Sequence, residues 1–156
     1  MTVNVVKGNI FESDCEVITD ANNAIGISGA GIALAFAKRY PQLSDYYNKY
    51  CQAMQLRFPN RVLLAPIIFQ KGFLDNKDYA VCKFPTMILP GEVCKIENIN
   101  ANLAELNLQI KMRDYKSIAL PALGCGIGRL PFDDLVAAVR EIFDNEAFRV
   151  DIHEPF

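Results

Sequence analysis

Short runs of β-branched and apolar residues alternate along this chain with longer stretches in which apolar residues recur every three or four positions. The short runs predict strands at residues 3–6, 17–19, 61–69, 79–84, 117–120 and 148–152. The longer stretches predict helices from about residue 32 to a break at Pro41, from there to about residue 56, from residue 95 onward, and over residues 135–143. Strands that alternate with helices predict a largely parallel sheet between two layers of helices.

The length of 156 residues suits one domain over residues 1–156, and an apolar fraction of 51% is enough to cover both faces of a central sheet. The net charge is −2, from 16 basic and 18 acidic residues without a long run of either sign. That balance argues against general nucleic-acid binding, which needs a basic surface.

The five cysteines are odd in number, widely spaced and form no C-x-x-C pair, so the sequence predicts neither a disulfide framework nor a metal site. No signal peptide begins the sequence, and no apolar run approaches the roughly 20 residues of a membrane span. We therefore expect a reduced, cytoplasmic protein with no metal, no other cofactor and no membrane partner.

A first glycine-rich loop follows the predicted strand at residues 17–19 and enters a helix. Glycines such as Gly29 and Gly31 let backbone amides approach an anion, and the positive end of the helix dipole favours negative charge there. The side chains of Asn22 and Asn23 can hydrogen-bond the hydroxyls of a sugar. The alternative is that these glycines only form a tight turn.

A second glycine-rich loop follows the predicted strand at residues 117–120 and also leads to a helix. Its alternate glycines Gly124, Gly126 and Gly128 can form a nest of amides around a phosphate. Arg129 either adds positive charge there or is a solvated surface residue. Neither loop is a P-loop or a good Rossmann fingerprint, and two such loops on one sheet suit a diphosphate better than a single phosphate.

Several motifs resemble, in order along nearly the whole chain, the successive signatures of macrodomains. They are Lys7-Gly8-Asn9-Ile10, residues 23–33, residues 38–41, Phe84-Pro85-Thr86 and residues 120–126. The most similar subgroup contains the DNA ADP-ribosyl glycohydrolase antitoxins and the terminal ADP-ribose glycohydrolases. ADP-ribose-1″-phosphate phosphatases are also similar around the first two motifs.

The resemblance implies a three-layer α/β/α fold with a mixed, mostly parallel sheet of about six strands. It implies that ADP-ribose or an ADP-ribosylated macromolecule is the partner, with Asn9 and Ile10 beside the adenine and Asn23 beside the distal ribose. By the same analogy one phosphate loop consists of Gly29, Ala30, Gly31 and Ile32, and the other of Gly124, Cys125, Gly126, Ile127, Gly128 and Arg129.

The chain departs from the family at positions that usually carry charged side chains. Asn9 replaces a carboxylate that accepts from the adenine amino group, which weakens that bond. Met87 stands where the antitoxin subgroup has a lysine, and a thioether can neither form a Schiff base nor donate a proton. Gly128 and Ala33 stand where other branches have acidic residues.

Two catalytic candidates remain, and they leave the function open. Asp20 is a candidate general base, although a structural carboxylate is the favoured reading of it, and Asn23 is a candidate for orienting a water molecule. The chain is then either a hydrolase of ADP-ribose-1″-phosphate or of an ADP-ribosyl bond, or a non-catalytic module that reads or sequesters ADP-ribose. A third alternative is a relative that uses the groove for another nucleotide.

Overall fold

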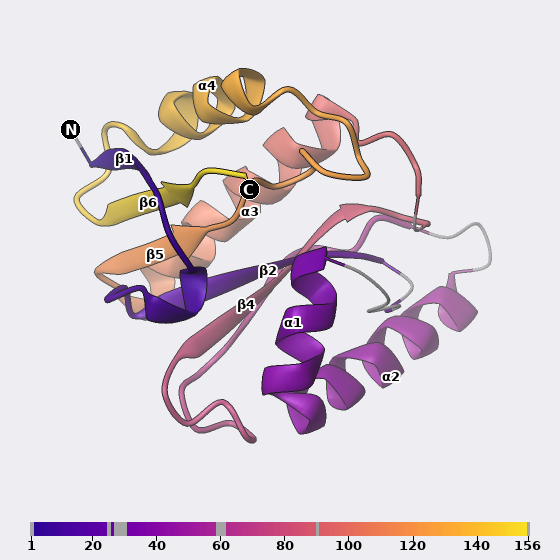
Figure 1. Ribbon diagram of the computed structural model, residues 1–156. Helices are drawn as coiled ribbons and strands as arrows, with labels where there is room; N and C mark the ends of the chain where they lie inside the picture. The colour runs from indigo at the N-terminus through magenta and orange to yellow at the C-terminus, as the bar shows by residue number, and fades with distance from the viewer. Residues whose placement is uncertain (1, 25, 27–30, 59–61, 90, 156) are drawn as a thin grey trace.

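The computed structural model describes residues 2–24, 26, 31–58, 62–89 and 91–155. Figure 1 shows their helices and strands. In chain order these are β1 (Val3–Val6), the 3-10 turn η1 (Ile10–Glu12), β2 (Val17–Asn23), α1 (Gly31–Arg39), α2 (Pro41–Arg57), β3 (Ile67–Phe69), β4 (Ala80–Met87), α3 (Ile96–Arg113), β5 (Ser117–Leu120), α4 (Phe132–Phe143) and β6 (Arg149–His153).

The strands form one sheet in the order β1-β6-β5-β2-β4-β3. Strand β3 runs antiparallel to β4, and every other neighbouring pair is parallel. Helices α1 and α2 lie on one face of the sheet and α3 and α4 on the other (Figure 1). The predicted three-layer α/β/α fold with a mixed, mostly parallel sheet is therefore confirmed.

Each face of the sheet has its own apolar core, because successive side chains of a strand point to opposite faces. On β2, Val17 packs into the core under α3 and α4, and Ile18 packs into the core under α1 and α2. Both residues are fully buried. Because helices cover both faces of the sheet, the predicted strands are continuous apolar runs and do not alternate between apolar and polar residues.

Strand β3 is shorter than the predicted strand at residues 61–69, and the described residues 62–66 form no strand. Pro66 has no N–H to donate to a ladder. The carbonyls of this segment bond to helix side chains instead: the Asn102 amide donates to Leu64 O at 3.0 Å, and the Gln109 amide donates to Pro66 O at 2.7 Å. Side chains of α3 thus replace a strand partner.

Strands β2 and β4 are longer than predicted and continue to Asn23 and Met87. Pro85 is accommodated inside β4 because β3 pairs only as far as Lys83, so no strand on that side needs a donor from position 85. The extra residues carry both strands to the edge of the sheet where the glycine loops begin.

In the part of the chain that the structure describes, no helix has the length and apolar character needed to cross a bilayer.

We expect Leu106→Ala in α3 to destabilise the fold by about 2–5 kcal/mol, because it empties a fully buried site between helix and sheet. Urea unfolding of the variant measures this loss. Leu108→Ala on the same helix is the matched control, since Leu108 is 54% exposed, and we expect it to change stability by less than about 0.5 kcal/mol. Equal losses in the two variants would contradict the assignment of the core.

Candidate functional site

A cavity of about 320 Å³ lies at the carboxyl ends of β2, β4 and β5. We call it the central cavity. Among the described residues it is lined by Ala21, Asn22, Asn23, Gly31, Ile32, Ala33, Thr86, Met87, Gly91, Ala122, Gly124, Gly126, Ile127 and Gly128. Both glycine-rich loops contribute to this lining, so the structure brings the two predicted loops together.

The first loop meets the cavity where α1 begins. Gly31 is the first residue of α1 and has a positive φ of 58°, a conformation that favours glycine. A Cβ atom at this position would have no atom within 4 Å. The positive end of the helix dipole therefore lies at the wall formed by Gly31 and Ile32. The predicted contacts of Gly29 and Ala30 fall outside the described residues.

The second loop is held in shape by Cys94, which comes from the segment before α3. A Cβ atom on Gly124 would lie 2.7 Å from Cys94 Sγ, and one on Gly128 would lie 2.8 Å from Cys94 Cβ. The Cys94 amide also donates to Gly128 O at 2.7 Å. Gly126 differs, because a Cβ atom there would meet nothing within 4 Å. A Cβ atom on Gly128 would also lie 2.7 Å from Gly124 O, so packing against Cys94 and within the loop requires glycine at positions 124 and 128.

Three successive amides of the second loop are available to a ligand. Within the described ranges, the backbone N–H groups of Gly126, Ile127 and Gly128 donate to no other residue. Unpaired amides on a curved loop form an anion-binding nest. The Ile127 side chain is 63% exposed beside them. The second loop can therefore bind a phosphate through its backbone.

Asn22 and Asn23 end β2 at the cavity, and both are more than nine-tenths buried. The pairing of β2 with β4 changes register between them, a local irregularity of the kind found next to functional sites. The Thr86 hydroxyl of β4 donates to the backbone carbonyl of Asn22 at 3.3 Å. The backbone of β2 is thus held against β4 at the point where the two asparagines reach the cavity.

Asp20 does not reach the cavity. Its carboxylate is fully buried on the α1–α2 side of the sheet and lies 2.7 Å from Lys83 Nζ. Lys83 Nζ also lies 5.5 Å from the centre of the Phe36 ring and 3.4 Å from the Ser44 hydroxyl. Burial raises the pKa of the Asp20 carboxyl, and Lys83 opposes that rise. This placement does not support the predicted general base, because the carboxylate is enclosed in the core.

Asn9 and Ile10 lie at the end of β1, outside the lining of the central cavity. Asn9 lines a second hollow of about 390 Å³ at the ends of β1 and β6, together with Gly8 and His153. We call this hollow the β1–β6 cavity. The Asn9 side-chain oxygen accepts from the Phe11 amide at 2.9 Å and caps η1. Ile10 is buried and packs into the core under α1 and α2.

Cys125 and Arg129 belong to the second loop, but they do not line the central cavity that the described residues form. Burial raises the pKa of the Cys125 thiol to about 11, so the thiol is protonated at neutral pH and is no nucleophile. Arg129 is exposed and has a positive φ of 60°. The loop thus turns these two side chains away from the space that its glycines line.

Sequence reasoning missed several lining residues. Ala21 and Gly91 lie outside the quoted motifs, and Ala122 lies within the motif at residues 120–126 but was assigned no contact. Thr86 and Met87 were noticed only through the Phe-Pro-Thr motif and its missing lysine. Cys94 was read only as one of the scattered thiols. Its role depends on contacts with residues 30 positions and more away, which no local pattern reveals.

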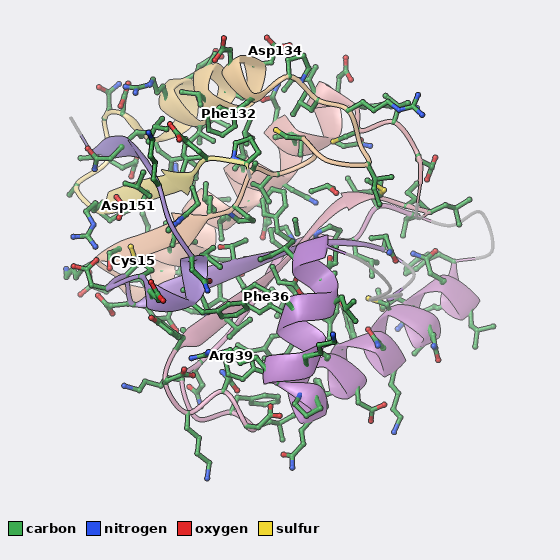
Figure 2. All side chains as sticks on the ribbon, viewed as in Figure 1. Cys15, Phe36, Arg39, Phe132, Asp134 and Asp151 are labelled. Carbon is green, nitrogen blue, oxygen red and sulfur yellow. The ribbon has the colours of Figure 1, made fainter. Side chains whose placement is uncertain are left out.

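A separate cluster of possible metal ligands consists of Asp14, Cys15 and Asp151, whose ligand atoms all lie within 4.8 Å of one another. Figure 2 labels Cys15, which precedes β2, close to Asp151 of β6. The guanidinium of Arg149 is 2.5 Å from Asp14 and 3.3 Å from Cys15 Sγ. Because a cation already pairs with these groups, the cluster is an ion-pair site of the fold.

A family model described as Macro domain matches residues 19–139. The DNA ADP-ribosyl glycohydrolase of Thermus aquaticus is 29% identical over 151 residues, which are 96% of this chain and 40% of that protein. The ADP-ribose 1″-phosphate phosphatase of Lodderomyces elongisporus is 26% identical, over 96% of this chain and 98% of that protein. The chain thus spans about two fifths of the length of the first of these relatives.

Solved structures give the same result for the fold. The macrodomain of Mycobacterium tuberculosis DarG has a TM-score of 0.87 and 27% identity, with 99% of this chain and 98% of that chain covered. Thermosipho africanus DarTG in complex with ADP-ribose has a TM-score of 0.84 and 23% identity, with 99% of this chain and 42% of that chain covered. At the latter identity the likeness concerns the fold alone.

We expect Gly124→Ala to lower the stability of the protein by about 1–3 kcal/mol, because a methyl group would collide with Cys94 at a residue whose φ is +75°. Thermal unfolding measures the loss as a lower midpoint. Gly126→Ala is the control, since its methyl group meets no neighbour, and we expect a change below about 0.5 kcal/mol. A stable Gly124→Ala protein would show that Cys94 does not constrain this loop.

Proposed function

Because the chain belongs to the macrodomain family, we propose that its central cavity binds the diphosphate of ADP-ribose or of a close derivative. One observation carries the proposal: the loops after β2 and β5 both line this cavity. Backbone amides at a helix N-terminus and in a nest are suited to anions without any charged side chain. Two such groups of backbone amides in one cavity match the two phosphates of a diphosphate.

The position of the β1–β6 cavity indicates how the ligand is oriented along the sheet. Strands β1 and β6 end at the same edge of the sheet as β5 and β2, because all four are parallel neighbours. A base held near Asn9 therefore lies on the side of β5 away from β2 and β4. We propose that the ligand follows the strand order, with the adenine at Asn9 and Ile10, the diphosphate at the glycine loops and the distal ribose at Asn23.

The chemistry of the lining favours binding without cleavage. Among the described residues that line the central cavity, none carries a carboxylate, an imidazole, a thiol or an amine. General acid–base and nucleophilic catalysis need such groups within reach of the reacting atoms. We propose that the chain, taken as one domain over residues 1–156, reads or sequesters ADP-ribose, either free or attached to a macromolecule.

The alternative is a hydrolase. It is favoured by the relatives whose names are DNA ADP-ribosyl glycohydrolase and ADP-ribose 1″-phosphate phosphatase. In this alternative Asn23 orients a water molecule at the distal ribose, since an amide can both donate and accept hydrogen bonds. No side chain of the described lining then serves as the base, and the substrate itself has to take up the proton.

We expect ADP-ribose to bind at least about tenfold more tightly than AMP, because one further charge-assisted phosphate contact contributes more than 1.4 kcal/mol. Isothermal titration of both ligands measures the difference.

Gly31→Glu should abolish ADP-ribose binding, since it places a carboxylate at the open wall of the cavity. Ala104→Glu, on the exposed side of α3, adds the same charge elsewhere and should bind normally. Equal affinities for AMP and ADP-ribose, or an unaffected Gly31→Glu protein, would refute the diphosphate assignment.

We expect no release of phosphate from ADP-ribose-1″-phosphate and no release of ADP-ribose from ADP-ribosylated DNA or protein, because the described lining offers no acid or base. Chromatography of the products under multiple-turnover conditions tests this expectation. Product formation that disappears in Asn23→Ala would instead establish the hydrolase. A contaminating activity would persist in that variant.

A further inference from the structure

His153 ends β6 and ties that strand to the turn that follows β1. It is the only histidine of the chain, is 8% exposed and lines the β1–β6 cavity. Its Nδ1 atom lies 3.0 Å from Gly8 O. A carbonyl oxygen can only accept a hydrogen bond, so Nδ1 is the nitrogen that donates. The imidazole of β6 thus holds the backbone of the turn at residues 7–9.

The backbone of this turn has few restraints of its own. Gly8 has a positive φ of 106°, a conformation that residues other than glycine rarely adopt. The last backbone bond between β1 and β6 runs from the Glu154 amide to Val6 O at 2.9 Å. Within the described ranges, the backbone of neither Lys7 nor Gly8 bonds to another backbone group. The His153 side chain therefore supplies a restraint that the main chain does not.

The segment that follows the turn is held separately, by α1 and by the residue before β4. Phe11 of η1 packs on Phe36 of α1 with ring centroids 4.7 Å apart, and the Tyr79 hydroxyl donates to Phe11 O at 3.2 Å. The Asn9 side chain accepts from the Phe11 amide and so belongs to the same unit. On the other side of the turn, β1 is held by its pairing with β6. Residues 7 and 8 thus join two fixed parts of the molecule, and Gly8 is the position where the backbone rotates most freely.

We propose that His153 is a positioning residue for the adenine end of the ligand. By fixing the joint at Gly8, it sets the place of Asn9 and Ile10 relative to the sheet. This inference rests on the proposed binding of ADP-ribose with its adenine at these two residues. His153 does not line the central cavity, so it leaves the contacts of the diphosphate unchanged. It acts through the turn and not through the ligand: the turn is ordered before the ligand arrives, which lowers the entropic cost of binding.

The test compares His153→Leu with His153→Asn by isothermal titration of AMP and of ADP-ribose. Leucine removes the donor, whereas the NH2 group of asparagine can donate from nearly the same place as Nδ1. We expect His153→Leu to lose about three- to tenfold in affinity, by the same factor for both ligands, because one lost hydrogen bond shifts the population of the ordered turn by that amount. His153→Asn should bind both ligands within about twofold of the wild type. An unchanged affinity in His153→Leu, a loss confined to ADP-ribose, or no recovery in His153→Asn overturns the proposal.

Gln109→Leu is the matched control, since it also removes a side-chain donor to a backbone carbonyl, that of Pro66, and lies outside both cavities. It should lower the thermal midpoint and leave both affinities unchanged. An equal loss of affinity in this control would show that destabilisation alone weakens binding, and would overturn the proposal. If His153→Leu does not fold, Gly8→Ala tests the same joint, because alanine rarely adopts a φ of 106°, and normal binding by that variant overturns the proposal. Wild-type protein that binds neither ligand would instead refute the proposed function.

A spectroscopic measurement reports on the hydrogen bond itself, independently of stability. Because the chain has one histidine, the imidazole signals of isotope-labelled histidine belong to His153. We expect nuclear magnetic resonance to show Nδ1 as the protonated nitrogen of the neutral ring, and AMP to shift its signal. A neutral ring protonated at Nε2, or a signal that AMP leaves unchanged, overturns the proposal.

Discussion

The parallel pairing of β2 with β5 is the constraint on which the site depends. Val17 and Ile18 of β2 pair with Ile118 and Ala119 of β5, so the two strands start together and end at the same edge of the sheet. Each is followed by a glycine-rich loop and then by a helix on a different face. Two loops separated by about a hundred residues in sequence therefore open into one cavity. An antiparallel arrangement of the same strands would have placed the loops at opposite edges.

A second constraint concerns the shape of the loop after β5. Gly124, Gly126 and Gly128 have different structural roles, although they look equivalent in the sequence as three alternate glycines. Cys94 leaves no room for a side chain at Gly124, and Cys94 together with the Gly124 carbonyl leaves none at Gly128, whereas Gly126 faces open space. The Cys94 backbone amide also donates a hydrogen bond to Gly128 O, which holds the loop against the segment before α3. The segment before α3 thus determines how the amides of the second loop are presented, through both the side chain and the backbone of Cys94.

The sequence predicted the order of strands and helices because this information is local. The runs at residues 3–6 and 117–120 coincide with β1 and β5, and described residues from both predicted glycine loops line one cavity because each loop follows a buried strand. The predicted length of the strand that contains β3 was wrong. Side chains of α3, and not another strand, bond to the carbonyls of Leu64 and Pro66. A structural role for Asp20 is the reading that the sequence favours over a general base, but the sequence does not reveal its partner. Its ion pair needs the register of β2 with β4, where Asp20 stands opposite Lys83, and no pattern within either strand specifies that register.

The distribution of charge explains what kind of site the fold can offer. The one carboxylate of β2 is paired with a lysine inside the α1–α2 core, where both charges are compensated and neither is available to a ligand. The cavity at the end of the same strand is lined, among the described residues, by glycines, small apolar residues, a threonine and two asparagines. Such a lining can stabilise an anion through the dipoles of backbone amides and side-chain amides, and not through charged side chains. Dipoles that are fixed by a sheet and a helix need no reorganisation when the ligand arrives, and they supply no proton for breaking its bonds. This distribution of charge among the described lining residues is the basis on which we propose that the cavity holds a diphosphate without hydrolysing it.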